Sequence, residues 1–271
     1  MIKSSCVCRE EARFTPFITY KNEAVFADYE GVCIRKCVHC GLLKTFSPGK
    51  AEKFDPLITK SEEYEARRKE FEVLFKPLVN FVKKYVPKGG SVLDVGCSSA
   101  ILLQLLKAQK YIVTGIEPNN YAFQAAYKKL GSSIIQGTAS SIDPHNQFDC
   151  IIYNHVLEHV EDINSEFIII DKLLKKKGIL IVGIPNTENV IFNIRKKYWE
   201  YLLPNEHRWH FSASYMRAFL RGKGYEFLDN YFCGDTRKDY PFIKRLYFGF
   251  LSFLNAILHT GESVFIVLRK S

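Results

Sequence analysis

The segment SVLDVGCSSA, residues 91–100, carries the strongest structural signal in the chain. An apolar run changes here into small residues, as it does where a buried strand turns into a helix. Gly96 and its small neighbours let a ligand approach the backbone, and the free N–H groups of the following helix favour a polar or negatively charged ligand group. The segment lacks the complete G-x-G-x-x-G pattern, because Ser98 and Ala100 stand where glycines are expected.

A matching signal closes the next apolar run, in the segment GIEPN at residues 115–119. Glu117 offers two carboxylate oxygens, which can accept hydrogen bonds from both ribose hydroxyls of an adenosine-containing cofactor. The alternative is that Asp94 and Glu117 serve only as turn and cap residues. Because two strand ends match instead of one, we favour the cofactor.

Beyond residue 90, apolar strand patterns alternate with helical patterns, which predicts a Rossmann-like, doubly wound α/β sheet of seven strands. Its ligand crevice should lie at the carboxyl ends of the strands. The predicted strands cover residues 91–95, 111–116, 133–136, 148–153, 179–184, 225–232 and 263–269. The predicted helices cover residues 99–108, 121–130, 165–174 and 213–221. We assign this domain to residues 91–271, with acceptor-side insertions at about 186–212 and 233–262.

In these segments the chain resembles the class I S-adenosylmethionine-dependent methyltransferases, in which a V-L-D-V-G-C strand and turn precedes an acidic second strand end. The resemblance continues through FDCIIYNHVLEHV at residues 148–160 and LLKKKGILIV at residues 173–182. It implies an enzyme that binds S-adenosylmethionine and transfers its methyl group. The cofactor-binding residues that it implies are Asp94, Gly96, Ser98, Glu117, Thr138, Ala139, Asn154 and His155.

The resemblance also implies how these residues divide the cofactor. Asp94, Gly96 and Ser98 face its methionine portion, while Glu117 holds the ribose. The pair Thr138 and Ala139 lies beside the adenine, although Thr138 departs from the usual acid. Asn154 and His155 border the methionine portion or the acceptor.

Residues 1–61 are rich in cysteine, with close pairs at Cys6 and Cys8 and at Cys37 and Cys40. The N-terminus has no apolar run behind Lys3, so we expect no secretory signal and a cytoplasmic protein whose thiols stay reduced. Two short cysteine knuckles can supply the four soft ligands of structural Zn²⁺. The pattern predicts a small zinc-ribbon-like module, followed by a linking helix within residues 62–90.

Two alternatives to this ligand set stay open, because Cys33 or His39 could replace one of the four cysteines. An N-terminal four-cysteine module resembles that of sugar, surface-polysaccharide and antibiotic-pathway methyltransferases, and also that of certain ribosomal RNA guanine methyltransferases. An oxidised or metal-free cysteine pair is the remaining interpretation.

Methyl transfer needs an aligned acceptor and, for some acceptors, a base. The segment PNEHRWHFS, residues 204–212, should overhang the crevice. Its Glu206 and His207 resemble the acceptor-side pair of sugar C-methyltransferases, in which the histidine acts as base. We expect His207 to be either that base, oriented by Glu206, or a structural histidine that holds the loop. We interpret His159 as structural.

The net charge of +9 permits an anionic partner, but the basic residues are dispersed along the chain. We therefore favour a small-molecule acceptor, a sugar, nucleotide-linked sugar or cell-surface polysaccharide precursor, over RNA. A non-catalytic binding protein is the third interpretation. The apolar segment 240–259 contains Lys244, Arg245 and Asn255, which predicts a pocket lid or a peripheral membrane contact near a lipid-linked acceptor instead of a transmembrane helix.

Overall fold

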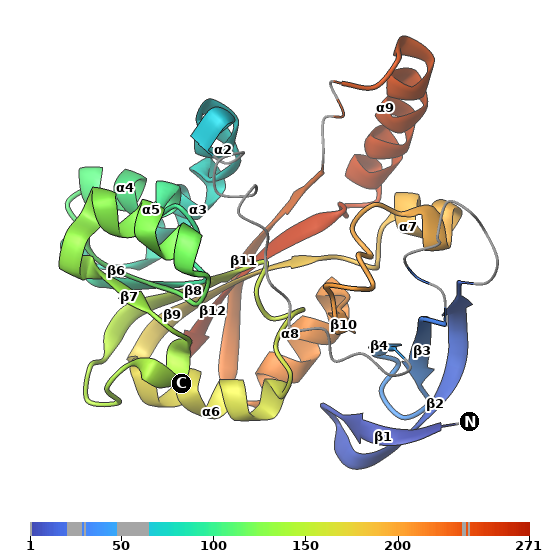
Figure 1. Cartoon of the computed structure of the whole chain (residues 1–271), viewed down its shortest axis with the longest axis horizontal. Helices are drawn as coiled ribbons and strands as arrows, with labels where there is room; N and C mark the ends of the chain where they lie inside the picture. The colour runs from blue at the N-terminus through green and yellow to red at the C-terminus, as the bar shows by residue number, and fades with distance from the viewer. Residues whose placement is uncertain (1, 21–28, 30, 48–64, 235–236, 238) are drawn as a thin grey trace.

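The computed structural model describes residues 2–20, 29, 31–47, 65–234, 237 and 239–271. Two sheets organise this part of the chain, a large one in the centre and a small one near the N-terminus (Figure 1). The segment from residue 48 to 64, which includes the beginning of the predicted linking helix, lies outside the described residues.

The central sheet has seven strands in the order β11-β12-β9-β8-β5-β6-β7. Its strands are β5 (Ser91–Val95), β6 (Ile112–Glu117), β7 (Ile134–Gln136), β8 (Phe148–Asn154), β9 (Leu174–Pro185), β11 (Tyr225–Cys233) and β12 (Ser263–Lys270). The strands β5 to β9 are parallel, whereas β12 runs antiparallel to both β9 and β11. The chain leaves β5 first toward β6 and later returns on its other side with β8, so a topological switch point lies beside β5.

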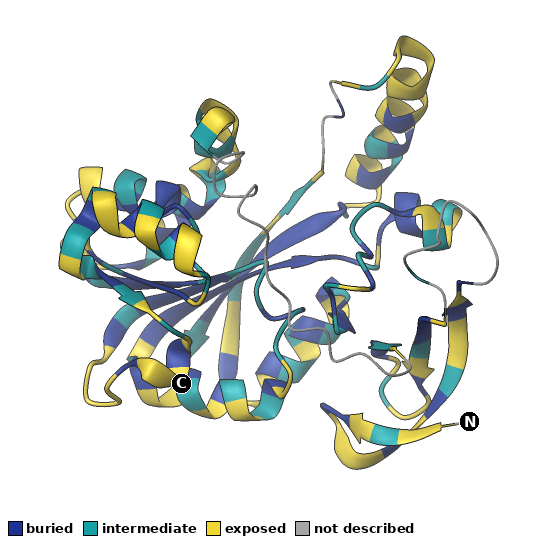
Figure 2. Cartoon of the chain, in the orientation of Figure 1, coloured by how far each residue is buried: buried dark blue, intermediate teal, exposed yellow. Residues whose placement is uncertain are grey.

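Apolar side chains alternate between the two faces of this sheet, and helices cover both. On one face, Cys150 and Ile152 join the core with α3 (Lys76–Tyr85), α4 (Ile101–Ala108) and α5 (Asn120–Leu130). On the other face, Ile151 and Tyr153 join the core with α6 (Ile163–Leu173) and α8 (Ala213–Gly222). The central strands are therefore largely apolar and mostly buried, as expected for a sheet that is covered on both sides (Figure 2).

The predicted linking helix is divided in the structure. The helices α2 (Arg68–Leu74) and α3 meet at Phe75, and a proline occupies the first turn of α3, a position that needs no backbone donor. Strand β9 begins at Leu174, earlier than predicted, because the basic segment after α6 continues the strand as far as the start of β8.

The N-terminal sheet is antiparallel, with the order β1-β2-β3-β4-β10. Its strands are β1 (Ile2–Cys6), β2 (Arg9–Thr19), β3 (Cys33–Cys37), β4 (Leu43–Phe46) and β10 (Trp209–His210). The edge strand β10 comes from the predicted acceptor-side insertion, far along the chain. The hydroxyl of Thr45 donates to the carbonyl of His207 at 2.8 Å, so this sheet is joined directly to the larger domain.

Two further helices complete the described chain, α7 (Val190–Arg195) and α9 (Phe242–Ile257). The long α9 projects from the molecule, and most of its outer part is exposed (Figures 1 and 2). No helix within the described ranges is long and apolar enough to span a membrane.

Candidate functional site

The turn after β5 brings the backbone close to its neighbours. Gly96 has a φ of +71°, and a Cβ at this position would lie 2.6 Å from Cγ2 of Val156. The amides of Gly96 and Cys97 both donate to the carbonyl of Ile116, at 2.8 and 3.1 Å, which holds the turn against the end of β6. Only glycine fits here without displacing a side chain.

The two residues that depart from the glycine pattern have the conformation that glycine favours. Ser98 has a φ of 47° and Ala100 a φ of 61°, both in the left-handed region. The turn therefore keeps its shape without those glycines, at a conformational cost of roughly 1–2 kcal/mol for each residue. Ala100 is fully buried as the residue before α4.

Glu117 faces this turn. Its Oε2 accepts the Ser98 amide at 2.8 Å, and its Oε1 accepts the Asn119 amide at 2.9 Å. Burial raises the pKa of Glu117, against the lowering effect of these two backbone hydrogen bonds. The sequence-predicted partners Gly96 and Glu117 are thus parts of one local structure, joined by the carbonyl of Ile116 and the amide of Ser98.

Asp94 is a second buried carboxyl beside Glu117, with a 4% exposed surface. Burial, and next the charge of Glu117, raise the pKa of Asp94 to about 8. The site therefore holds two buried acidic groups, an arrangement that a positively charged ligand stabilises. Clustered, perturbed carboxyls in a crevice are typical of a functional site.

A cavity of about 680 Å³ opens at the carboxyl ends of the strands. Among the sequence-predicted residues, its walls include Asp94, Gly96, Ser98, Asn154 and His155. The structure adds residues from distant segments, namely α2 and its C-terminal end, the aromatic Tyr201, and the ends of β11 and β12. Glu117 is not among the residues that line the cavity, but its carboxylate accepts a hydrogen bond from the amide of Ser98, which does line it.

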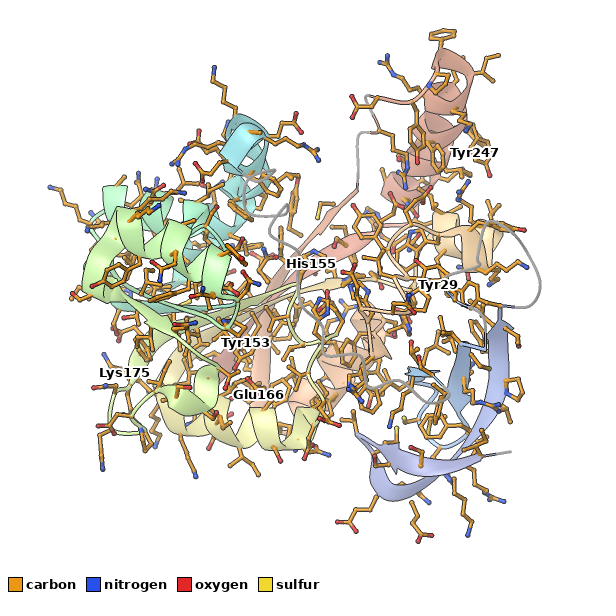
Figure 3. The ribbon with its side chains drawn as sticks, in the orientation of Figure 1. Tyr29, Tyr153, His155, Glu166, Lys175 and Tyr247 are labelled. Carbon is orange, nitrogen blue, oxygen red and sulfur yellow. The ribbon has the colours of Figure 1, made fainter. Side chains whose placement is uncertain are left out.

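Strand β8 ends at Asn154, and both Asn154 and the next residue, His155, line this cavity. Figure 3 labels His155 near the centre of the molecule. The Oδ1 of Asn154 is buried and has no hydrogen-bond partner within the described chain, so it can accept a donor from a ligand. His155 has a φ of 56°, and its ring contacts the Glu158 Oε1 at 3.1 Å and the Ser263 hydroxyl at 2.9 Å. Both ring nitrogens are therefore engaged, which fixes the imidazole at the cavity wall.

The predicted adenine residues lie beyond the end of β7. The amide of Gly137 donates to the carbonyl of Glu117 at 3.1 Å, which places this segment next to the predicted ribose residue. Ala139 is buried and begins a 3-10 turn, whereas Thr138 is exposed and its hydroxyl contacts Ser140. Neither Thr138 nor Ala139 belongs to the cavity wall.

The structure does not place Glu206 and His207 at the cavity, contrary to the expectation that they face an acceptor. His207 is buried, its Nδ1 lies 3.0 Å from the carbonyl oxygen of Tyr201, and its ring packs on His159 with centroids 4.8 Å apart. The backbone carbonyl of Glu206 accepts a hydrogen bond from the Nδ1 of His159 at 2.9 Å. Burial lowers the pKa of His207 to about 4, which makes it a weak proton acceptor at neutral pH.

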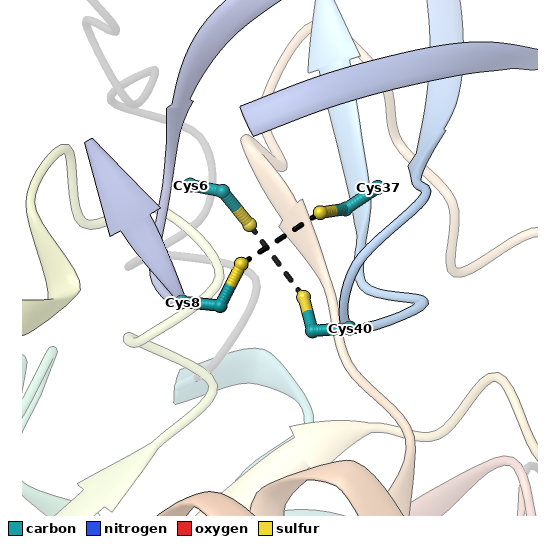
Figure 4. A group of neighbouring side chains, drawn as sticks. All are labelled: Cys6, Cys8, Cys37 and Cys40. Carbon is teal, nitrogen blue, oxygen red and sulfur yellow. Dashed lines mark hydrogen bonds between the residues drawn. The ribbon is translucent and has the colours of Figure 1, made fainter. Parts of the chain in front are cut away.

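The four cysteines of the two predicted knuckles meet between β1 and β3 (Figure 4). The Sγ atoms of Cys6 and Cys40 are 3.6 Å apart, and those of Cys8 and Cys37 are 3.8 Å apart. A tetrahedral zinc ion with Zn–S bonds of about 2.3 Å needs sulfurs about 3.8 Å apart, whereas a disulfide needs about 2.05 Å. The spacing therefore suits a shared metal ion.

The two alternative ligands do not join this group. Cys33 is buried and its sulfur lies near the Thr19 hydroxyl, while His39 is exposed. Neither residue belongs to the four-cysteine cluster.

Comparison with known proteins agrees with this geometry. A family model described as "Methyltransferase domain" matches residues 64–230. A ubiquinone biosynthesis O-methyltransferase of Rickettsia conorii is 27% identical over 137 residues, which are 49% of this chain and 46% of that protein. The chain thus spans about half the length of this curated relative.

Solved structures show the same fold at lower identity. A possible histamine N-methyltransferase from Thermotoga maritima has a TM-score of 0.57 at 21% identity, over 79% of this chain and 97% of its own. The magnesium protoporphyrin IX methyltransferase from Synechocystis, solved with bound SAH, has a TM-score of 0.53 at 15% identity, over 76% and 86%. Because the family model covers more than half of the 271 residues, the chain belongs to the methyltransferase domain family.

Proposed function

We propose that this protein transfers a methyl group from S-adenosylmethionine to a small-molecule acceptor. Family membership supports the reaction, and the observation that carries the proposal is the cavity in which Asp94, the turn at Gly96 and Asn154 converge. S-adenosylmethionine, when bound, supplies an electrophilic methyl group on a positively charged sulfur. The protein's own contribution is then to hold donor and acceptor in line.

The residues at the cavity suit this cofactor. We assign the methionine portion to Asp94, Gly96 and Ser98, because a buried acidic group with a raised pKa gains from an adjacent positive charge. The buried, unpartnered Oδ1 of Asn154 suits an ammonium donor, and His155 borders the same region.

Ribose and adenine assignments follow from the position of β6 and β7. Glu117 is our proposed ribose residue, because it ends β6 and its carboxylate accepts a hydrogen bond from the amide of Ser98 at the cavity wall. We assign the adenine edge to Thr138 and Ala139, which the Gly137 hydrogen bond holds beside the end of β6.

For the acceptor, we propose a lipid-linked small molecule that reaches the site from α9. A second cavity of about 750 Å³ lies between β11 and α9 and shares Cys233 and Gly234 with the first. The outer face of α9 exposes large apolar side chains, among them Tyr247 (Figure 3). Lys244 and Arg245 lie in its first turn, which suits contact with an anionic lipid surface. The exposed apolar residues are Phe242, Ile243, Leu246, Tyr247, Phe250, Phe253, Ile257 and Leu258.

This acceptor class includes two candidates. A cell-surface polysaccharide precursor or other lipid-carried sugar is our first, and the relatives named for ubiquinone biosynthesis suggest an aromatic lipid precursor as the second. RNA remains the alternative, which the dispersed basic residues do not favour.

We also propose that Cys6, Cys8, Cys37 and Cys40 bind a structural Zn²⁺. The sulfur spacing supports this assignment, and four protein ligands leave no coordination position for a substrate. A sheet as small as β1–β4 has little core of its own, so the metal would contribute to its folding.

The experiment is a screen with methyl-labelled S-adenosylmethionine and purified protein. Lipid extracts, water-soluble sugar nucleotides and RNA serve as separate acceptor pools, and mass spectrometry identifies the labelled product. We expect label in the lipid fraction. Label in RNA alone, or in no pool, would contradict the proposal.

A further inference from the structure

Behind the cavity wall, three side chains converge that the proposed methyl transfer does not use. Glu158, His159 and His207 each offer one ligand atom, and these atoms lie within 4.8 Å of one another. Glu158 and His207 are 1% and 5% exposed. The carboxylate comes from the segment after β8 and His207 from the loop before β10, so the tertiary fold brings them together.

The carboxylate of Glu158 is only half satisfied. Its Oε1 lies 3.1 Å from the Nδ1 of His155, but its buried Oε2 has no hydrogen-bond partner in the described ranges of the chain. A buried carboxylate oxygen without a partner is costly, and such groups mark sites where an ion completes the coordination.

The two imidazoles are oriented as metal ligands are. The Nδ1 of His159 is 2.9 Å from the carbonyl oxygen of Glu206, and the Nδ1 of His207 is 3.0 Å from that of Tyr201. A carbonyl can only accept, so each Nδ1 carries the proton, and a neutral ring then keeps its lone pair on Nε2. This outer hydrogen bond to a backbone carbonyl is the usual support of a metal-binding histidine.

We propose that Glu158, His159 and His207 form a second metal site, which binds a divalent transition-metal ion of the Zn²⁺ class. Two imidazole nitrogens and one carboxylate oxygen suit this class of ion better than Mg²⁺ or Ca²⁺, which prefer oxygen ligands. Metal–ligand bonds of about 2.0–2.1 Å in a tetrahedral site place the ligand atoms about 3.4 Å apart. The three ligand atoms now lie within 4.8 Å of one another, so side-chain rotations that bring them closer by about 1.4 Å or less are sufficient.

This site is separate from the four cysteines, with which it shares no residue. A metal ion at this site would hold the 201–208 loop against the segment after β8. Two backbone hydrogen bonds already join these segments, because the amides of Arg208 and Trp209 donate to the carbonyl of Glu158 at 2.8 and 3.1 Å. His155 joins the site to the cofactor cavity, because its ring contacts Glu158 on one side and lies at the cavity wall. His210 is not a ligand in this arrangement, since its Nε2 is 2.8 Å from the Thr45 hydroxyl.

The test counts the metal ions that the 271-residue chain binds. Protein grown with added Zn²⁺ is analysed by elemental mass spectrometry, and the metal-free protein is titrated with Co²⁺, whose thiolate complexes absorb strongly while its histidine and carboxylate complexes absorb weakly. We expect two equivalents of metal, one with the thiolate spectrum and one without. Glu158→Gln, which keeps the side-chain volume, should lose the second equivalent only, with an affinity reduced at least about a hundredfold.

His145→Gln is the matched control, because His145 is exposed and belongs to neither candidate metal cluster, and it should keep both equivalents. A wild-type chain that binds one equivalent with a thiolate spectrum would overturn the proposal. A Glu158→Gln variant that keeps two equivalents would overturn it as well. His207→Gln should likewise lose the second equivalent. If this variant does not fold, the Co²⁺ titrations of the wild type and of Glu158→Gln decide the question without it.

Discussion

Replacement of Asp94 by asparagine should stabilise the ligand-free protein while it weakens cofactor binding. Burial and the charge of Glu117 raise the pKa of Asp94 from 3.8 to about 8. At pH 7 the Asp94 carboxyl is ionised in the unfolded chain but protonated in the folded one. Because pH 7 lies roughly three units above the unfolded pKa, binding this proton on folding costs about 4 kcal/mol. Asparagine has nearly the same shape and avoids this cost, so Asp94→Asn should gain up to about 4 kcal/mol.

The sign of the pH dependence follows from the raised pKa. The contribution of Asp94 to stability is fully present below pH 3.8 and is lost as the pH rises through about 8. Urea unfolding of wild type and Asp94→Asn at pH 4 to 8 should therefore show a difference near zero at pH 4 that widens by about 1.4 kcal/mol per pH unit.

The exposed variant Asp143→Asn is the control and should change stability by less than about 0.5 kcal/mol. The reasoning is refuted if Asp94→Asn is less stable than wild type at pH 7, or if the difference between them does not change with pH.

Three further predictions concern separate parts of the molecule. Gly96→Ala should lower the free energy of unfolding by about 2–3 kcal/mol in a urea titration, because alanine disfavours a φ of +71° and its Cβ would lie 2.6 Å from Val156. A decrease below about 0.5 kcal/mol would contradict this prediction. Removal of Zn²⁺ by a chelator should increase hydrogen exchange in the amides of β1–β4 before those of β5; equal protection with and without chelator would exclude a structural metal at the cysteines. Phe250→Glu on α9 should abolish binding to anionic vesicles in a sedimentation assay, because Phe250 belongs to the exposed apolar face of this helix. Ile168→Glu changes a similarly exposed residue on α6 and should leave binding unchanged. Equal binding by both variants would exclude α9 as the contact.

The central sheet could be predicted from the sequence because its signals are local. The strands β5, β6 and β8 are short apolar runs that end in polar or small residues, and their predicted bounds differ from the observed ones by one residue or less. The partnership of Gly96 and Glu117 follows from the same signals, since parallel strands end at the same edge of a sheet.

The remaining features depend on tertiary contacts that no local pattern contains. Strand β10 has only two residues and exists because it pairs with β4, which is more than a hundred and sixty positions earlier in the chain. His207 was predicted at the crevice because its loop follows β9, but the loop turns inward and packs the ring on His159. Tyr201 at the cavity wall was missed for the same reason, since nothing near it in the sequence indicates a ligand.

The N-terminal sheet also contains a tertiary contact that the sequence does not indicate. The cysteine spacing correctly indicated a four-cysteine cluster, yet the predicted separation at residue 61 did not include the strand that β10 adds to the N-terminal sheet. A module that borrows an edge strand from its neighbour has no marker in its own sequence.

Calorimetric titration of the purified protein with S-adenosylmethionine tests the account most directly. We expect one binding site per chain, and we expect Glu117→Gln to weaken binding about 10- to 100-fold, because a carboxylate that holds the ribose loses one of its charged acceptor oxygens. No measurable heat of binding to the wild type, or an unchanged affinity in Glu117→Gln, would contradict the assignment of this cavity.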